Sequence, residues 1–205
     1  MIIQSLYDAV SFKRGHDSRT EAQYCARLLT QLIPMGELVW LDPMGNFALQ
    51  VGKPSRTLFV AHTDTVHSGE GINLSYEKDG FLYAQGDALG ADDGAGIALL
   101  THMMHKGVAG TYLFCRGEEC GGIGSSYIAE LHEGWLRQFD RAIQFDRRGT
   151  ADVITHQGGQ RCASDEFGLA LATALSEANE HLLYAPSDRG VFTDTANFVS
   201  IIPEC

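Results

Sequence analysis

Apolar residues recur along this 205-residue chain with two different spacings, which predict helices and strands in alternation. Helical spacing occurs in four segments: 18–33, 92–107, 122–136 and 164–182. Ser18 and Ser164 begin the first and last of them, as serine N-caps do. Short apolar runs predict strands in 36–52 (two strands around the turn 42–46), 57–61, 73–86 (a hairpin turning at 79–80), 110–119, 141–149 and 151–159. A last apolar run, 198–202, predicts a strand that is cut short.

This order of elements defines a fold class. Helices that alternate with apolar strands, together with two hairpins, predict an α/β fold with a mixed, largely parallel sheet sandwiched by helices. In such sheets, functional side chains gather beyond the carboxyl ends of the strands. We therefore expect any site of this protein to lie along that edge.

Composition narrows the classes of function. A hydrophobic content of 44% over this length allows one domain with a substantial core. The formal charge of −11 argues against nucleic acid or an anionic membrane as a partner. No run approaches the roughly 18 apolar residues of a membrane span, and the N-terminus lacks a secretory leader pattern. The five cysteines are scattered and form no matched redox or zinc set. We expect a cytoplasmic, reduced protein.

Acidic and imidazole side chains follow four of the expected strands. They are His62 and Asp64, Asp92 and Asp93, Glu118 and Glu119, and Asp146. Asp92 follows His62 by 30 residues, Glu119 follows Asp92 by 27, and Asp146 follows Glu119 by 27. Each interval is about the length of one strand-plus-helix unit. Neighbouring strands would therefore present these groups around one point.

Each of these motifs has an ordinary interpretation when taken alone. A surface carboxylate is usually solvated, and the aspartates before the glycines of "GADDGAG" could simply cap a helix. Carboxylates crowded into one crevice, however, repel one another unless a cation or a proton compensates. A histidine among several carboxylates suits zinc or a similar divalent ion.

The motifs also resemble a known group of enzymes. "HTDTV", "GADDGAG", the "EE" pair followed by "GGIGS", and "FD" occur in the same order in the co-catalytic zinc exopeptidases, the metallopeptidase families M20 and M28. The resemblance runs from about Leu58 to Asp146, and "GVFTDTANF" is similar to a later segment near the active site of these enzymes.

The resemblance implies roles for most of these residues. His62 and Asp146 would bind one zinc ion, Asp92 would bridge to a second, and a cis peptide bond often follows this aspartate in the family. Asp64 would hold the other nitrogen of the His62 ring, which fixes the tautomer. Cobalt or manganese could occupy the same ligands.

The adjacent glutamates would divide the remaining work. By resemblance, Glu119 binds the second metal and Glu118 is the general base that takes a proton from water and passes it to the leaving amine. Because neighbouring residues of an extended backbone point apart, one can face the metal and the other the water.

Two departures from the family matter. Thr193 lies only 47 positions after Asp146, which leaves no room for the family's inserted lid or dimerisation domain. We therefore expect residues 1–205 to be a single metallopeptidase-like catalytic domain. The family's remaining ligand, a histidine near the C-terminus, has no counterpart here. We expect a chain truncated at the C-terminus; the alternatives are one firmly held metal with a weak second site, or a non-catalytic descendant.

The sequence thus predicts a zinc-dependent, aminopeptidase-like hydrolase that cleaves amide bonds in peptides or acylated amino acids. One alternative is a catalytically impaired or truncated homologue that only binds metal. Another is an acidic α/β domain that binds Ca²⁺ or Mg²⁺, although a histidine ligand argues against these oxygen-preferring ions. The apolar run 198–202, if it formed an exposed sheet edge, would also favour self-association.

Overall fold

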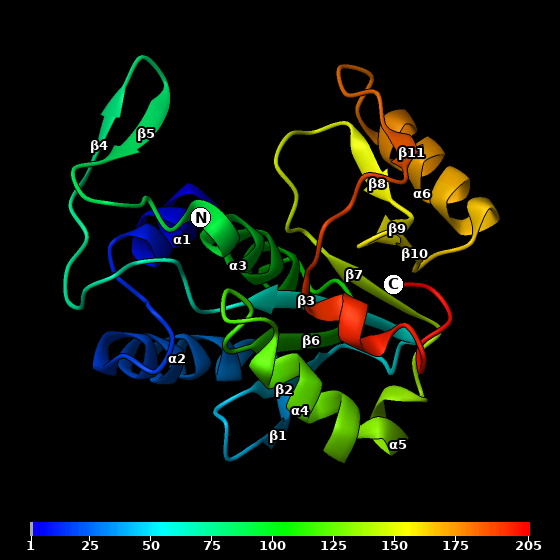
Figure 1. Cartoon of the computed structure of the whole chain (residues 1–205), viewed down its shortest axis with the longest axis horizontal. Helices are drawn as coiled ribbons and strands as arrows, with labels where there is room; N and C mark the ends of the chain where they lie inside the picture. The colour runs from blue at the N-terminus through cyan, green and yellow to red at the C-terminus, as the bar shows by residue number, and fades with distance from the viewer. Residues whose placement is uncertain (1) are drawn as a thin grey trace.

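A five-stranded sheet organises the protein, whose computed structural model describes residues 2–205 (Figure 1). The strand order is β1-β2-β6-β3-β7, with β1 and β2 antiparallel and β6, β3 and β7 parallel to one another. The strands of this sheet are β1 Glu37–Leu41, β2 Phe47–Val51, β3 Thr57–His62, β6 Gly110–Cys115 and β7 Arg141–Gln144. The predicted mixed, largely parallel sheet is confirmed.

Helices cover both faces of this sheet. The covering helices are α1 Ile2–Val10, α2 Arg19–Leu32, α3 Ala91–His105, α4 Ile123–Leu131 and α5 Glu133–Leu136, and the 3₁₀ turns are η1 Ile33–Met35 and η2 Asp194–Phe198. Helix α6, Asp165–Ala178, packs mainly against short strands outside this sheet. Helices α1, α2 and α3 supply Ala9, Leu28 and Ile97 to the core on one face. Helices α4 and α5 cover the other face with Ile128 and Leu136. Ser18 and Ser164 cap α2 and α6 as predicted. No helix within residues 2–205 has both the length and the apolar character to cross a bilayer.

Smaller strand pairs lie outside the central sheet. They are β4 Ser75–Lys78 with β5 Phe81–Ala84, β8 Asp152–Ile154 with β11 Ala185–Ser187, and β9 His156–Gln157 with β10 Gln160–Arg161. The β4–β5 ribbon projects on one side of the molecule, and the group of α6, β8 and β11 lies on the other (Figure 1). The predicted hairpin at 73–86 is therefore confirmed, including its turn at 79–80.

The predicted strand at 198–202 is wrong. This run continues from η2 as turns, and Phe198 and Ile202, four residues apart, are both buried against the sheet. Residues four apart share a face in a helical turn and in a strand alike, so the burial of both side chains is compatible with the turns that the run forms. After them, Glu204 bridges to Arg141 of the edge strand β7, and the Glu204 carbonyl accepts a hydrogen bond from the Ala142 amide at 2.7 Å. The exposed edge expected from this run is therefore not formed.

Two further boundaries differ from the prediction. The helix expected over 122–136 is interrupted at His132, which separates α4 from α5. The helix expected to reach residue 182 ends at Ala178. Helix α1, at the start of the chain, was not anticipated, although it contributes Ala9 and Val10 to the core.

Candidate metal centre

His62, the last residue of β3, is at the middle of the candidate site. Its side chain is buried, and its Nε2 atom lies 3.1 Å from Asp92 Oδ1, 3.8 Å from Asp146 Oδ2 and 3.9 Å from Glu118 Oε2. His62, Asp92 and Asp146 each offer one ligand atom, and these atoms all lie within 4.8 Å of one another. The structure therefore brings together three of the four predicted metal ligands. His62 and Asp146 come from the ends of β3 and β7, whereas Asp92 lies in the first turn of α3 and not at a strand end as expected.

The opposite side of the imidazole faces Asp64. His62 Nδ1 lies 3.4 Å from Asp64 Oδ1 and 3.2 Å from the Asp64 carbonyl oxygen. Burial disfavours the imidazolium, but the hydrogen bonds with Asp64 and Asp92 outweigh it and hold the pKa of His62 well above its usual value. A cation bound at Nε2 would replace the proton that this nitrogen carries in the imidazolium.

Asp64 has a second role, because it also holds the loop that carries the two glutamates. Its fully buried carboxylate accepts the backbone N–H of Glu118 at 3.0 Å and that of Glu119 at 3.1 Å. Burial by itself would raise the pKa of Asp64, but the hydrogen bonds from His62 and the two amides lower it below its usual value. One charged side chain thus fixes both the histidine and the loop opposite it.

The adjacent aspartates at the start of α3 point in different directions. The peptide bond between Asp92 and Asp93 is cis, as the resemblance implied. Asp92 faces His62, with its side chain 68% exposed. Asp93 is buried, accepts the His62 backbone N–H at 3.2 Å and the Gly96 N–H at 2.9 Å, and has a pKa raised well above its usual value by burial. Asp93 therefore supports the backbone of the site.

Glu118 and Glu119 also occupy different surroundings. The Glu118 side chain is only 11% exposed, and burial raises its pKa to about 8, with smaller contributions from the charges of Asp194 and Asp146. A carboxyl group with this pKa can exchange a proton near neutral pH. Glu119, the fourth predicted ligand, does not join the three-residue ligand group found within residues 2–205. Burial, followed by the charge of Asp92, raises its pKa.

Asp146 is held from behind by residues distant in sequence. Thr193 donates its hydroxyl proton to Asp146 Oδ2 at 2.7 Å, and the Thr193 amide donates to Gln157 Oε1 at 3.0 Å. The Gln144 side-chain amide lies 3.4 Å from both Asp146 Oδ2 and Asp194 Oδ2. The segment "GVFTDTANF" therefore reaches the site, as the resemblance implied.

Asp194 is a site residue that we did not single out from the sequence. It is fully buried, and burial raises its pKa to about 6. One of its oxygens, Oδ1, has no hydrogen-bond partner among the described residues. The signal that could have found it was present, because the quoted segment "GVFTDTANF" contains an aspartate directly after Thr193.

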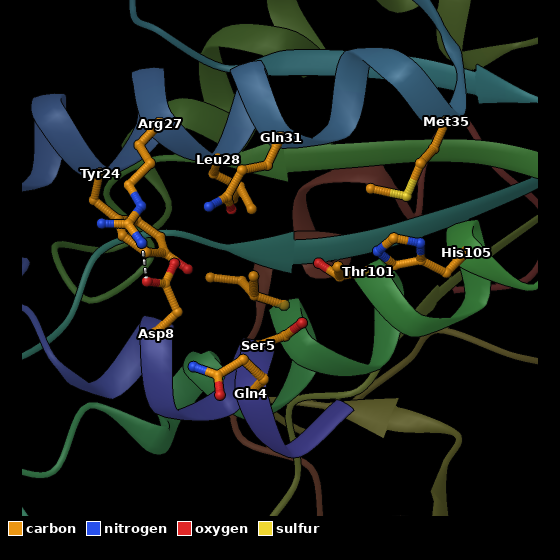
Figure 2. A pocket seen from close by; sticks show the side chains of 11 residues that line it. Gln4, Ser5, Asp8, Tyr24, Arg27, Leu28, Gln31, Met35, Thr101 and His105 are labelled. Carbon is orange, nitrogen blue, oxygen red and sulfur yellow. Dashed lines mark hydrogen bonds and ion pairs between the residues drawn. The ribbon is translucent and has the colours of Figure 1, made fainter. Parts of the chain in front are cut away.

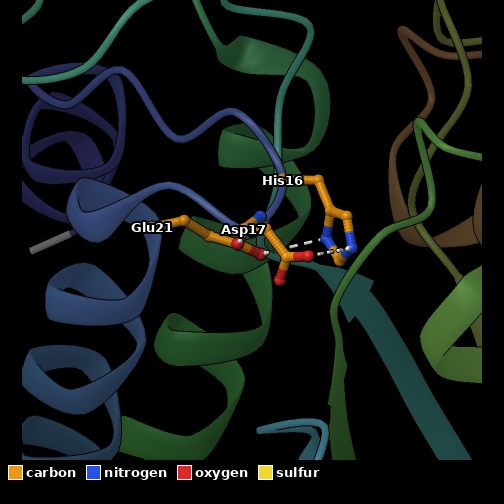
Figure 3. A group of neighbouring side chains, drawn as sticks. All are labelled: His16, Asp17 and Glu21. Carbon is orange, nitrogen blue, oxygen red and sulfur yellow. Dashed lines mark hydrogen bonds and ion pairs between the residues drawn. The ribbon is translucent and has the colours of Figure 1, made fainter.

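A second group of possible ligands, His16, Asp17 and Glu21, lies at the start of α2 (Figure 3). His16 ring nitrogens lie 3.7 Å from Asp17 and 3.9 Å from Glu21. The guanidinium of Arg116, however, hydrogen-bonds to both oxygens of Glu21 and approaches Asp17 to 3.6 Å. Because this guanidinium occupies both oxygens of Glu21, we interpret the group as an ion-pair network rather than a metal site.

Two further residues near the ligands in sequence have structural partners. Arg147 pairs with Asp152 at 2.8 Å, and His67 hydrogen-bonds through its ring to Thr65 and the Ala88 carbonyl. A cavity of about 430 Å³ lies between α1, α2 and α3 (Figure 2), and none of the candidate ligands lines it. The candidate ligands therefore lie apart from this cavity.

Comparisons with known proteins agree with this fold. No protein-family model and no curated protein sequence matches the chain. Among solved structures it is similar to aminopeptidase PepT from Bacillus cereus, with a TM-score of 0.62, 23% identity, and coverage of 76% of this chain and 46% of that one. Legionella pneumophila LapA aminopeptidase matches with a TM-score of 0.68, 15% identity, and coverage of 97% and 57%. The Pyrococcus horikoshii TET1 peptidase matches with a TM-score of 0.65, 14% identity, and coverage of 98% and 88%.

These similarities define the class of fold. The chain has the mixed α/β architecture of these peptidases, and at these identities the likeness concerns the fold alone. The chain spans about half the length of the PepT and LapA structures.

Proposed function

We propose that this chain is a zinc-dependent hydrolase of the exopeptidase type, which cleaves an amide bond in a peptide or an acylated amino acid. The observation that carries the proposal is the convergence of His62 Nε2, Asp92 and Asp146 within 4.8 Å, with the carboxyl group of Glu118 only 3.9 Å from the same nitrogen. The similarity of the fold to aminopeptidases supports it.

The donor set fits a zinc ion. One imidazole nitrogen and two carboxylates are ligands that zinc accepts, and a fourth position would remain open for water or substrate. His62, Asp92 and Asp146 would hold the ion, and Asp64 would fix the His62 ring through Nδ1. When bound, the metal would polarise the scissile carbonyl and acidify water.

The residues of the chain then divide the proton transfers. Glu118 accepts a proton from the attacking water and delivers it to the leaving amine. The raised pKa of Glu118 suits this role, because the group both gains and loses a proton near neutral pH. The amide hydrogen bond from Glu118 to Asp64 keeps the loop that carries this base beside the histidine.

A second metal site is less complete in this chain. Asp92 could contribute to it, but Glu119 stands outside the ligand group found within residues 2–205. This observation favours one alternative, a homologue that binds metal without turning over substrate. Cobalt and manganese are further candidates for the same ligands.

Metal stoichiometry and activity separate these functions. We expect at least one zinc ion per chain by elemental analysis after equilibration and gel filtration, and hydrolysis of aminoacyl anilides or N-acyl amino acids by the loaded protein. Glu118→Gln is expected to bind zinc as the wild type does and to lose at least about 10²-fold in kcat. If the wild type and Glu118→Gln both bound zinc and neither hydrolysed a substrate, the remaining function would be that of a homologue that only binds metal. Turnover that survives Glu118→Gln would exclude Glu118 as the base.

A further inference from the structure

The projecting β4–β5 ribbon has an unusual composition for a surface element. Tyr76 pairs with Tyr83 and Lys78 with Phe81 across the ribbon, and Asp79 and Gly80 form its turn with positive φ angles of 52° and 77°. The Gln85 amide donates to the Leu74 carbonyl at 2.9 Å, which extends the pairing by one residue toward the body. A two-stranded ribbon of this kind is only marginally stable by itself.

One face of the ribbon is apolar and exposed to solvent. Directly paired residues share a face, and alternate residues of one strand do as well, so Leu74, Tyr76, Phe81 and Tyr83 lie together. Their exposed fractions are 60%, 45%, 67% and 43%, and the two tyrosine rings stack with centroids 5.5 Å apart. We call these four side chains the aromatic face.

The opposite face of the ribbon is turned toward the body of the protein. Leu82 and Ala84 there are partly buried, and Glu77 accepts a hydrogen bond from the Tyr7 hydroxyl at 2.9 Å. The aromatic face is therefore held in a fixed direction, away from α1, instead of folding back onto the protein.

The size of this surface indicates a protein partner. With about 150–250 Å² for each aromatic side chain, the exposed parts of the aromatic face amount to roughly 400 Å². This area matches the largest apolar patch of a typical monomer, about 300–600 Å², and such patches are often functional. Two such faces in contact would bury about 800 Å², which falls among the small interfaces of weak, transient complexes.

Charge favours a second copy of the same chain as the occupant. Lys78, at the tip of the ribbon, lies on the aromatic face, while the exposed residues Glu70 and Asp87 flank the base of the ribbon in sequence. One oxygen of each of these carboxylates accepts hydrogen bonds within the chain, from Arg19 and Ser68 respectively. If two ribbons pack face to face and antiparallel, each tip lysine meets the base carboxylates of the other copy. The pairing is isologous, as in most symmetric dimers.

We propose that the chain forms a reversible homodimer through the aromatic face of its β4–β5 ribbon. This surface differs from the run 198–202, for which the sequence predicted self-association. The proposed dimer does not depend on the proposed hydrolase activity. Interfaces this small are typical of weak, transient complexes, so we expect a dissociation constant in the micromolar range or above.

Sedimentation velocity on the full chain from about 1 to 300 µM tests this proposal. We expect a monomer–dimer equilibrium in the wild type and at least about a 10-fold weaker association for Phe81→Glu, since burying that charge is unfavourable. Leu183→Glu is the matched control, because Leu183 is 78% exposed and lies outside the ribbon; it is expected to dimerise as the wild type does.

Charge reversal tests the antiparallel arrangement. Lys78→Glu should weaken the dimer, and the double change Lys78→Glu with Glu70→Lys should restore part of the loss. A wild type that stays monomeric at 300 µM would overturn the proposal and leave the aromatic face to another partner. Equal association of the wild type and Phe81→Glu would also overturn it, and circular dichroism of each variant shows whether it is folded.

Discussion

Replacing Asp64 by asparagine tests whether one buried carboxylate organises the candidate site. Asp64 is fully buried and accepts two backbone N–H groups, at 3.0 and 3.1 Å, while it also faces His62 Nδ1. Asparagine keeps the shape but turns an NH₂ group toward at least one of these donors. A hydrogen bond to a charged group contributes about 1.5–3 kcal/mol, and an unsatisfied buried donor costs about 1–3 kcal/mol. Relief of repulsion from neighbouring acids offsets part of this.

We therefore expect Asp64→Asn to lower the free energy of unfolding by about 2–4 kcal/mol, measured by urea denaturation at pH 7. Because the folded-state pKa of Asp64 is lowered, the wild type's advantage is present above pH ~4 and is lost as the pH falls through that lowered value. Zinc affinity, measured by competition with a chromophoric chelator, should fall about 10- to 100-fold as the His62 ring loses its support.

Asp42→Asn is the control for this experiment. Asp42 is also buried and accepts hydrogen bonds from the Asn46 backbone amide at 3.0 Å and its side-chain amide at 2.7 Å, but it supports no candidate ligand. It should lose stability without losing zinc affinity. If Asp64→Asn and Asp42→Asn had the same zinc affinity as the wild type, the positioning role of Asp64 would be refuted.

Two further predictions concern the same site. Thr193→Val removes the hydroxyl that donates to Asp146 at 2.7 Å and should weaken zinc binding about 10-fold. Thr193→Ser keeps a hydroxyl and should bind zinc as the wild type does. Equal zinc affinities of the three proteins in a chelator titration would show that Asp146 is positioned without Thr193. In the metal-free protein, Glu118 has a pKa raised to about 8, so its contribution to stability is complete below about pH 4.5 and is lost as the pH rises through 8. The Tm of metal-free wild type should therefore fall more steeply between pH 6 and 9 than that of Glu118→Gln, and parallel profiles would contradict the raised pKa.

Local sequence pattern predicted most elements because their causes are local. The N-caps Ser18 and Ser164, the turn at 79–80 and the apolar runs of β3 and β6 depend on residues a few positions apart. The run 198–202 was misjudged because an apolar stretch of five residues fits a strand or a helical turn equally well. Its conformation follows from the sheet face that Phe198 and Ile202 cover, which local sequence does not specify.

The sequence by itself determined the kind of chemistry at the site: one histidine and several carboxylates, in an order that resembles the zinc exopeptidases. Only the tertiary structure decided which of them meet. It brings Asp92 and Asp146 to His62, leaves Glu119 outside that group, and adds Thr193 and Asp194 from a distant segment. The physical reason is that spacing along a chain fixes the face on which a side chain lies, whereas convergence depends on strand order, loop path and buried hydrogen bonds between residues far apart in sequence.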